Sequence, residues 1–162
     1  MDEDEIFRLA KSMRGLDEGF IGVIPKNQIP DLTNTTTTKS FIVNTDKYGE
    51  PGTHWVGIYV SQDDSVVYFD SFGIDPNVDP YIINLIRECG KSSLYYSNRQ
   101  IQSFNSSLCG LYTLYTLYLL TNEGLNLNQC LDIFDNTNLE VNDDMIRDVF
   151  KNIFILLRLD MI

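Results

Sequence analysis

The chain has 162 residues, which is the size of one domain that can bury its own core. Hydrophobic residues make up 43% of it and charged residues 22%, which excludes a disordered chain. The 12 Lys and Arg against 23 Asp and Glu give a net charge of −11. This charge disfavours nucleic-acid binding and attracts a basic partner, but its simpler interpretation is that it keeps the protein soluble.

The first third of the chain predicts one helix and two strands. Asp2 or Asp4 caps the helix, and its apolar residues repeat at helical spacing: Ile6, Leu9, Ala10 and Met13. Strands follow over 20–24 and 41–44, with a polar, turn-rich loop over 26–39 between them.

The middle of the chain predicts an antiparallel hairpin. Alternating apolar residues over 54–60 and 66–69 flank a polar turn. Asp79 and Pro80 then open a helix that ends near residue 89, because an Asp cap followed by proline is typical of a first helical turn. A further strand is expected over 93–97.

The last third predicts three helices. Residues 105–107, Asn-Ser-Ser, are expected to cap a helix over 108–120 that is apolar on nearly every side and therefore central and buried. Helices over 127–134 and 142–159 complete the chain. Because no repeat or linker divides it, residues 1–162 are predicted to form one domain.

His54 is the only histidine of the chain, and a lone histidine is often just a hydrogen-bonded structural group. Here, however, it begins one strand of the predicted hairpin, and Asp70 ends the neighbouring strand. The two side chains are therefore expected side by side, where a carboxylate can orient an imidazole. Trp55, the next residue, can cover one face of that ring.

Three cysteines, Cys89, Cys109 and Cys130, have neither a disulfide framework nor the paired spacing of a zinc site, so no metal site is predicted. Cys109 is expected in the first turn of the central helix, where the helix dipole stabilises a thiolate. The alternative is a small apolar residue at the start of a buried helix.

Gln102 lies seven residues before Cys109. From there its amide can donate to an oxyanion together with the Cys109 N–H. Gln100 is the alternative donor if the loop is displaced.

The order His54, Asp70, Gln102, Cys109 resembles the adenovirus protease (adenain) family and the related deSUMOylase-type ubiquitin-like-protein proteases. The resemblance rests on three segments: Val43-Asn44-Thr45 leading to Gly52-Thr53-His54-Trp55; Val67-Tyr68-Phe69-Asp70-Ser71-Phe72-Gly73; and Gln102-x-x-Asn105-Ser106-x-x-Cys109-Gly110-Leu111. The spacing from Gln102 to Cys109 fits adenain better than the deSUMOylases, whereas the acid Asp70 matches the deSUMOylases.

The resemblance implies an α+β, papain-like fold, with a small mixed β-sheet packed on a central helix and flanking helices. It implies a cysteine endopeptidase with His54, Asp70 and Cys109 in catalysis, Gln102 in the oxyanion hole and Trp55 at the substrate. No cofactor is implied. Adenain is assisted by DNA and by an activating peptide. The charge of −11 disfavours DNA and leaves a basic activating peptide open.

The resemblance further implies cleavage of capsid and virion precursor proteins at glycine-containing sites during maturation, in a DNA virus, virophage or Polinton-type element. We then expect the protein in the virion and in the cytoplasm or nucleus of the infected cell. Its acidic first residues do not resemble a secretory signal, and no apolar run reaches the roughly 20 residues of a membrane span. Two alternatives are a ubiquitin-like-protein protease acting on host conjugates and a catalytically inactive structural or interaction module of a virion.

Overall fold

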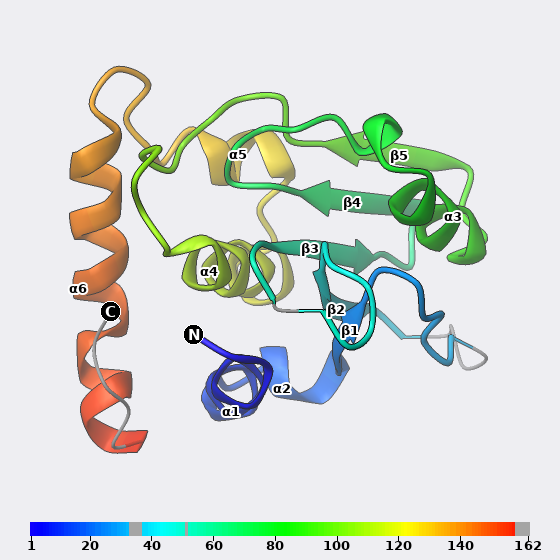
Figure 1. The fold of residues 1–162 in the computed structure, drawn as a ribbon, viewed down its shortest axis with the longest axis horizontal. Helices are drawn as coiled ribbons and strands as arrows, with labels where there is room; N and C mark the ends of the chain where they lie inside the picture. The colour runs from blue at the N-terminus through cyan, green and yellow to red at the C-terminus, as the bar shows by residue number, and fades with distance from the viewer. Residues whose placement is uncertain (33–36, 51, 158–162) are drawn as a thin grey trace.

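The computed structural model describes residues 1–32, 37–50 and 52–157, which fold around one five-stranded sheet with strand order β1-β2-β3-β4-β5 (Figure 1). The strands are β1 (Phe20–Pro25), β2 (Lys39–Asn44), β3 (Trp55–Val60), β4 (Ser65–Phe69) and β5 (Ser93–Tyr96). The outer pairs β1–β2 and β4–β5 are parallel, and the two inner pairs are antiparallel. The predicted mixed sheet is therefore confirmed, with the hairpin β3–β4 at its centre.

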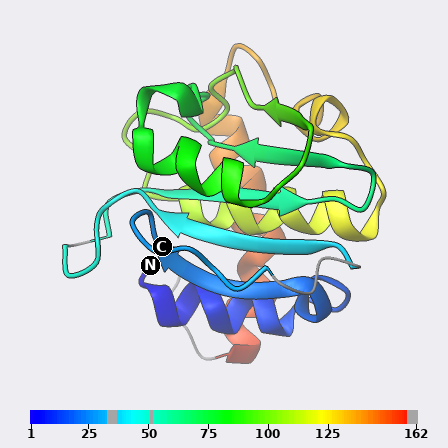
Figure 2. The same cartoon turned by 90° about the vertical axis from the view of Figure 1, so that its right-hand side faces the viewer.

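Helices cover both faces of the sheet. They are α1 (Glu3–Ser12), α2 (Leu16–Gly19), α3 (Pro80–Glu88), α4 (Cys109–Asn122), α5 (Leu127–Leu131) and α6 (Leu139–Leu157), with a short 3-10 turn over Pro76–Val78. Seen from the side, α3 lies in front of the sheet and α4 lies behind it (Figure 2). Among the described residues, no helix is both long and apolar enough to cross a membrane.

The larger part of the core lies between the sheet and α4. This helix is apolar nearly all round, and ten of its residues are buried, as the sequence predicts for a central helix. It approaches β3 closely because Gly57 has no side chain: a Cβ there would lie 2.8 Å from the Cγ2 of Thr113. Helices α1, α5 and α6 add apolar residues around α4.

The opposite face of the sheet is covered by α3. Ile82, Leu85 and Ile86 pack there against buried residues of the inner strands. Asp79 caps α3 by accepting the N–H of Tyr81, so the predicted start of this helix is correct. With α3 on one face and α4 on the other, strands β3 and β4 are buried on both faces. These are the strands next to His54 and Asp70.

Several local predictions are wrong. Helix α4 begins at Cys109 without a side-chain cap on its first turn: the hydroxyl of Ser106 accepts the N–H of Leu108, one residue before the helix, at 3.3 Å, and it also accepts from Gln102. Residues 16–19 form the unpredicted helix α2, α5 ends at residue 131, and α6 begins at residue 139. The predicted end of α6, residue 159, and residues 33–36 of the predicted loop lie outside the described residues.

Candidate active site

Three segments meet at one end of the sheet. His54 directly precedes β3, Asp70 directly follows β4, and Cys109 opens α4, which packs across β3. The antiparallel register pairs Gly57 with Phe69, so the start of β3 lies beside the end of β4, as the hairpin predicts. The fold therefore brings together one imidazole, one carboxylate and one thiol from three separate elements.

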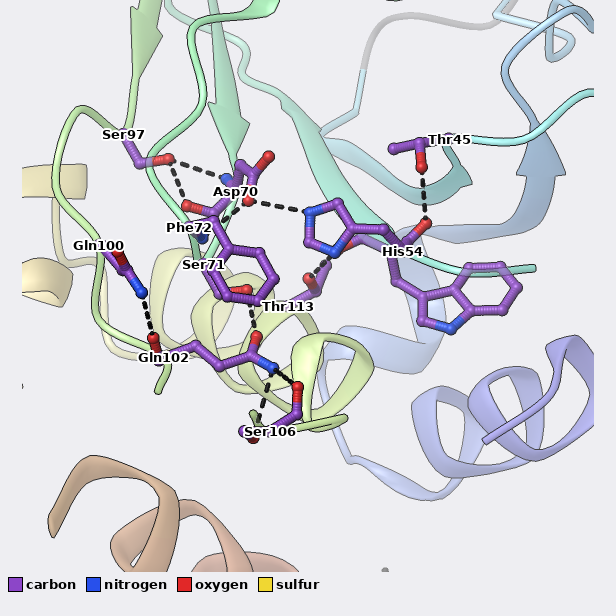
Figure 3. Close-up of polar contacts among 11 residues, drawn as sticks. Thr45, His54, Asp70, Ser71, Phe72, Ser97, Gln100, Gln102, Ser106 and Thr113 are labelled. Carbon is purple, nitrogen blue, oxygen red and sulfur yellow. Dashed lines mark hydrogen bonds and ion pairs between the residues drawn. The ribbon is translucent and has the colours of Figure 1, made fainter. Parts of the chain in front are cut away.

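The imidazole of His54 contacts the Asp70 carboxylate directly (Figure 3). Its Nε2 atom lies 2.9 Å from Oδ1 of Asp70, whose side chain is almost completely buried. The same oxygen accepts the backbone N–H of Phe72 at 2.8 Å. With Nε2 engaged by Asp70, Nδ1 is the ring nitrogen that remains for a second partner.

That second partner is the thiol of Cys109. Burial lowers the pKa of His54, but hydrogen bonds with Asp70 and Cys109 outweigh it and raise the pKa from 6.5 to about 9. For the thiols of Cys89 and Cys130, burial is the main effect. It raises the pKa of Cys89 to about 12 and that of Cys130 to about 11. Cys109 is thus the cysteine that faces an imidazole with a strong tendency to carry a proton.

Ser97 holds the acid in place, and it is not among the residues predicted from the sequence. This fully buried hydroxyl accepts the backbone N–H of Asp70 at 2.8 Å and donates to the carbonyl of the same residue at 2.9 Å. A small polar residue at the end of the predicted strand over 93–97 was the only available signal. These two bonds hold the backbone on both sides of the Asp70 Cα, and so fix where its side chain begins.

Gln102 lies fully buried on the loop that leads to Cys109. Its Oε1 accepts the hydroxyl of Ser71 at 2.6 Å, and its Nε2 donates to the carbonyl of Ser106 at 2.7 Å and to its hydroxyl at 3.3 Å. Gln100 donates its amide to the backbone carbonyl of Gln102 at 2.9 Å. The side chain of Gln102 is thus tied both to the residue after Asp70 and to the approach to Cys109.

A buried carboxylate on α6 anchors the same loop, which the sequence did not predict. Asp143, 3% exposed, accepts the hydroxyl of Tyr112 at 2.7 Å and also accepts the hydroxyl of Ser103. The neighbouring Asn142 donates to the carbonyl of Ile101 at 2.9 Å. Helix α6 therefore fixes the segment that contains Gln102 to the body of α4.

Trp55 is buried and packs against Gly52, where a Cβ would lie 2.8 Å from the indole Cζ2. The ring that contacts the imidazole is that of Phe72, with centroids 5.2 Å apart. Trp55 lines an open groove of about 510 Å³ with Met1, Asn44, Gly52 and four acidic residues: Asp2, Glu3, Glu5 and Glu50. Across the described part of the chain, no group of three His, Cys, Asp or Glu side chains is arranged to hold a metal ion.

The fold is that of the adenain-type and deSUMOylase-type cysteine proteases, as predicted. The structure of ChlaDub1 from Chlamydia trachomatis superposes with a TM-score of 0.63 at 15% identity, covering 92% of this chain and 90% of that one. The ASFV protease matches with a TM-score of 0.50 at 21% identity, over 62% of this chain and 40% of that one. The central domain of the Lpg1148 protein from Legionella pneumophila gives a TM-score of 0.54 at 17% identity and covers 94% of both chains.

The sequence comparison gives a viral relative. The candidate thiol protease R355 of Acanthamoeba polyphaga mimivirus is 35% identical over 81 residues, which covers 44% of this chain and 26% of that protein. The chain thus matches about a quarter of that relative. No protein-family model matches the chain. Together these comparisons show the cysteine-protease fold and a local sequence similarity to a viral thiol protease.

Proposed function

We propose that residues 1–162 form one cysteine endopeptidase domain in which Cys109 is the nucleophile. The observation that carries the proposal is the position of the His54 imidazole, which hydrogen-bonds Asp70 through Nε2 and contacts the thiol of Cys109. With a pKa of about 9, His54 carries a proton at neutral pH and can stabilise the negative charge that Cys109 needs as a nucleophile. Asp70 orients the ring and stabilises its positive charge.

The reaction follows from these roles. The Cys109 thiolate attacks the scissile carbonyl, and His54 then gives its proton to the leaving amine, which departs and leaves a thioester on Cys109. Water, deprotonated by His54, attacks the thioester and releases the acid. No metal or other cofactor takes part in this sequence of steps.

Gln102 is the proposed side-chain donor to the oxyanion, together with the backbone N–H of Cys109. Its Nε2 makes one short and one longer bond to Ser106, at 2.7 and 3.3 Å. If the longer bond, to the Ser106 hydroxyl, breaks, the freed N–H of Gln102 can donate to a substrate oxygen. The shorter bond, to the Ser106 carbonyl, then still holds the amide in place. Losing one such donor typically costs about 3–4 kcal/mol of transition-state stabilisation.

The proposed substrates are capsid and virion precursor proteins, cut at glycine-containing sites during maturation in the virion or the infected cell. The mimivirus relative and the adenain-like motifs support this assignment. Trp55 is the proposed substrate contact, because it lines the open acidic groove and directly follows His54 in the chain. The four carboxylates of that groove favour a basic segment, from a substrate or from an activating peptide, and disfavour nucleic acid.

A ubiquitin-like-protein protease that acts on host conjugates is the second candidate. It is favoured by Asp70, because the deSUMOylases also have aspartate at this position. The two candidates differ in the substrate they need: cleavage of a folded conjugate that ends in Gly-Gly, without cleavage of glycine-containing virion precursors, would select the second one.

The experiment that tests the proposal measures the alkylation rate of Cys109 against pH. Cys89 and Cys130 are replaced by serine, and the variant is compared with the same chain carrying His54→Ala. We expect rapid labelling below about pH 7 that is lost in His54→Ala, since the imidazolium stabilises the thiolate. Labelling with a midpoint near the ordinary thiol value of about 8.5 in both proteins would contradict an assembled site in the isolated chain and leave two interpretations, a missing activating peptide and an inactive virion module.

A further inference from the structure

Two phenylalanines form an apolar shelf, defined here as Phe72 and Phe104, beside the candidate active site. The ring of Phe72 lies 5.2 Å from the imidazole of His54, tilted by 43°. The ring of Phe104 meets that of Phe72 edge-on, with centroids 6.4 Å apart, and its side chain is 85% exposed. Phe104 is the most exposed large hydrophobic side chain among the described residues.

The shelf is held by the same contacts that hold the reactive groups. The N–H of Phe72 donates to the Asp70 oxygen that binds His54. Phe104 sits in a turn closed by a hydrogen bond of 3.1 Å from the N–H of Ser106 to the carbonyl of Ser103. Ser103 is bound to Asp143 and Ser106 to Gln102, so both ends of this turn are anchored. Phe104 is therefore an exposed apolar side chain on a fixed backbone.

The chemistry of the reaction says which part of a substrate meets this shelf. His54 must hand its proton to the leaving nitrogen, so the residue that carries this nitrogen has to lie against the imidazole. Phe72 is the ring packed on that imidazole, and Phe104 extends its apolar surface outward. The groove beside Trp55 shares no residue with the shelf and is lined by acidic side chains.

We propose that Phe72 and Phe104 form the subsite for the residue that directly follows the scissile bond, and that this subsite takes an aliphatic or aromatic side chain. The inference rests on the proposed endopeptidase function and adds the leaving-side specificity of the same site. A polar or acidic side chain at that position stays hydrated and gains no apolar contact with the two rings. Apolar side chains bury surface on the rings, which favours them in the transition state.

The experiment compares two peptides with the same acyl half, ending in glycine, and with leucine or serine as the first leaving-side residue. The wild type is expected to cleave the leucine peptide with a kcat/KM about tenfold higher. In Phe104→Ala this ratio should fall to about one, and Phe104→Leu should keep most of it because an apolar side chain remains. Tyr95→Ala, which removes another exposed aromatic ring on β5 outside the site, is the matched control and should keep the wild-type ratio.

The outcomes separate the two proposals. The subsite is overturned if the wild type and Phe104→Ala prefer leucine equally, or if the wild type shows no preference. In both cases cleavage itself still supports the endopeptidase function. Failure of the wild type to cleave either peptide, with Cys109 unreactive toward alkylation, would overturn both. Thermal melting of Phe104→Ala should match the wild type, because an exposed ring contributes little to the stability of the core.

Discussion

One carboxylate oxygen, Oδ1 of Asp70, binds both the Nε2 of His54 at 2.9 Å and the N–H of Phe72 at 2.8 Å. The first bond sets the orientation of the imidazole, and the second sets the direction of the turn that follows β4. The aromatic ring of Phe72 then packs on the imidazole that its own backbone helps to place. Asp70 therefore couples the orientation of the His54 imidazole to the position of Phe72 in the proposed leaving-side subsite.

Asp70→Asn should lower the pKa of His54 from about 9, because the hydrogen-bonded negative charge is lost while burial remains. The imidazolium is needed for activity, so the alkaline limb of the kcat/KM profile should move to lower pH, and kcat should fall by at least about tenfold. The measurement is the pH dependence of peptide cleavage. An unchanged alkaline limb would contradict the role given to Asp70.

The raised pKa of His54 also predicts how the stability of the fold depends on pH. The pKa of His54 in the folded protein lies above its value of about 6.5 in an unfolded chain, so proton binding stabilises the fold. This contribution is fully present below about pH 6.5 and is lost as the pH rises through about 9. The free energy of unfolding, measured in urea at pH 6 and pH 9.5, should therefore fall more in the wild type than in His54→Ala.

The parts of the site that the sequence predicted depend on regular structure. An antiparallel hairpin with period-two alternation places His54 beside Asp70 whatever the rest of the chain does. The supporting bonds do not follow from any such rule: Ser97 to Asp70, Ser71 to Gln102 and Ser103 to Asp143 join residues 27, 31 and 40 positions apart. They depend on how loops 97–108 and 132–138 fold, and no periodicity in the sequence encodes that.

Ser71→Ala tests the link between the acid and the oxyanion loop. It removes the hydroxyl that donates to the Oε1 of the buried Gln102, which leaves an acceptor without its partner at a cost of about 1–3 kcal/mol. We expect kcat for peptide cleavage to fall while the alkylation rate of Cys109 at pH 7 stays near that of the wild type. Ser12→Ala, on the far end of α1, is the control and should change neither rate. A parallel loss of alkylation and cleavage would mean that Ser71 acts on the thiol itself.

Asp143→Asn tests whether α6 positions the loop that carries Gln102. An amide in place of the carboxylate cannot accept from both Tyr112 and Ser103, and a lost bond to a buried charged group costs about 1.5–3 kcal/mol. Stability in urea and kcat should both decrease. Asp144→Asn is the matched control, since that neighbouring side chain is 79% exposed and pairs with Arg147 at the surface. Equal behaviour of the two variants would contradict a positioning role for Asp143.

Gly73→Ala tests the turn that ends the acid-bearing segment. Gly73 has a φ of +68°, its N–H donates to the carbonyl of Asp70 at 2.9 Å, and a Cβ would lie 2.6 Å from the carbonyl carbon of Arg99. Gly90 has nearly the same φ, +66°, with nothing within 4 Å of its Cβ position, so Gly90→Ala isolates the strain of a positive φ. We expect Gly90→Ala to lose about 1 kcal/mol of unfolding free energy and Gly73→Ala about 3 kcal/mol or more, with reduced activity only in the latter. Similar losses of stability in both variants would mean that the Arg99 backbone moves aside freely, and full activity of Gly73→Ala would mean that the turn does not hold Asp70 against His54.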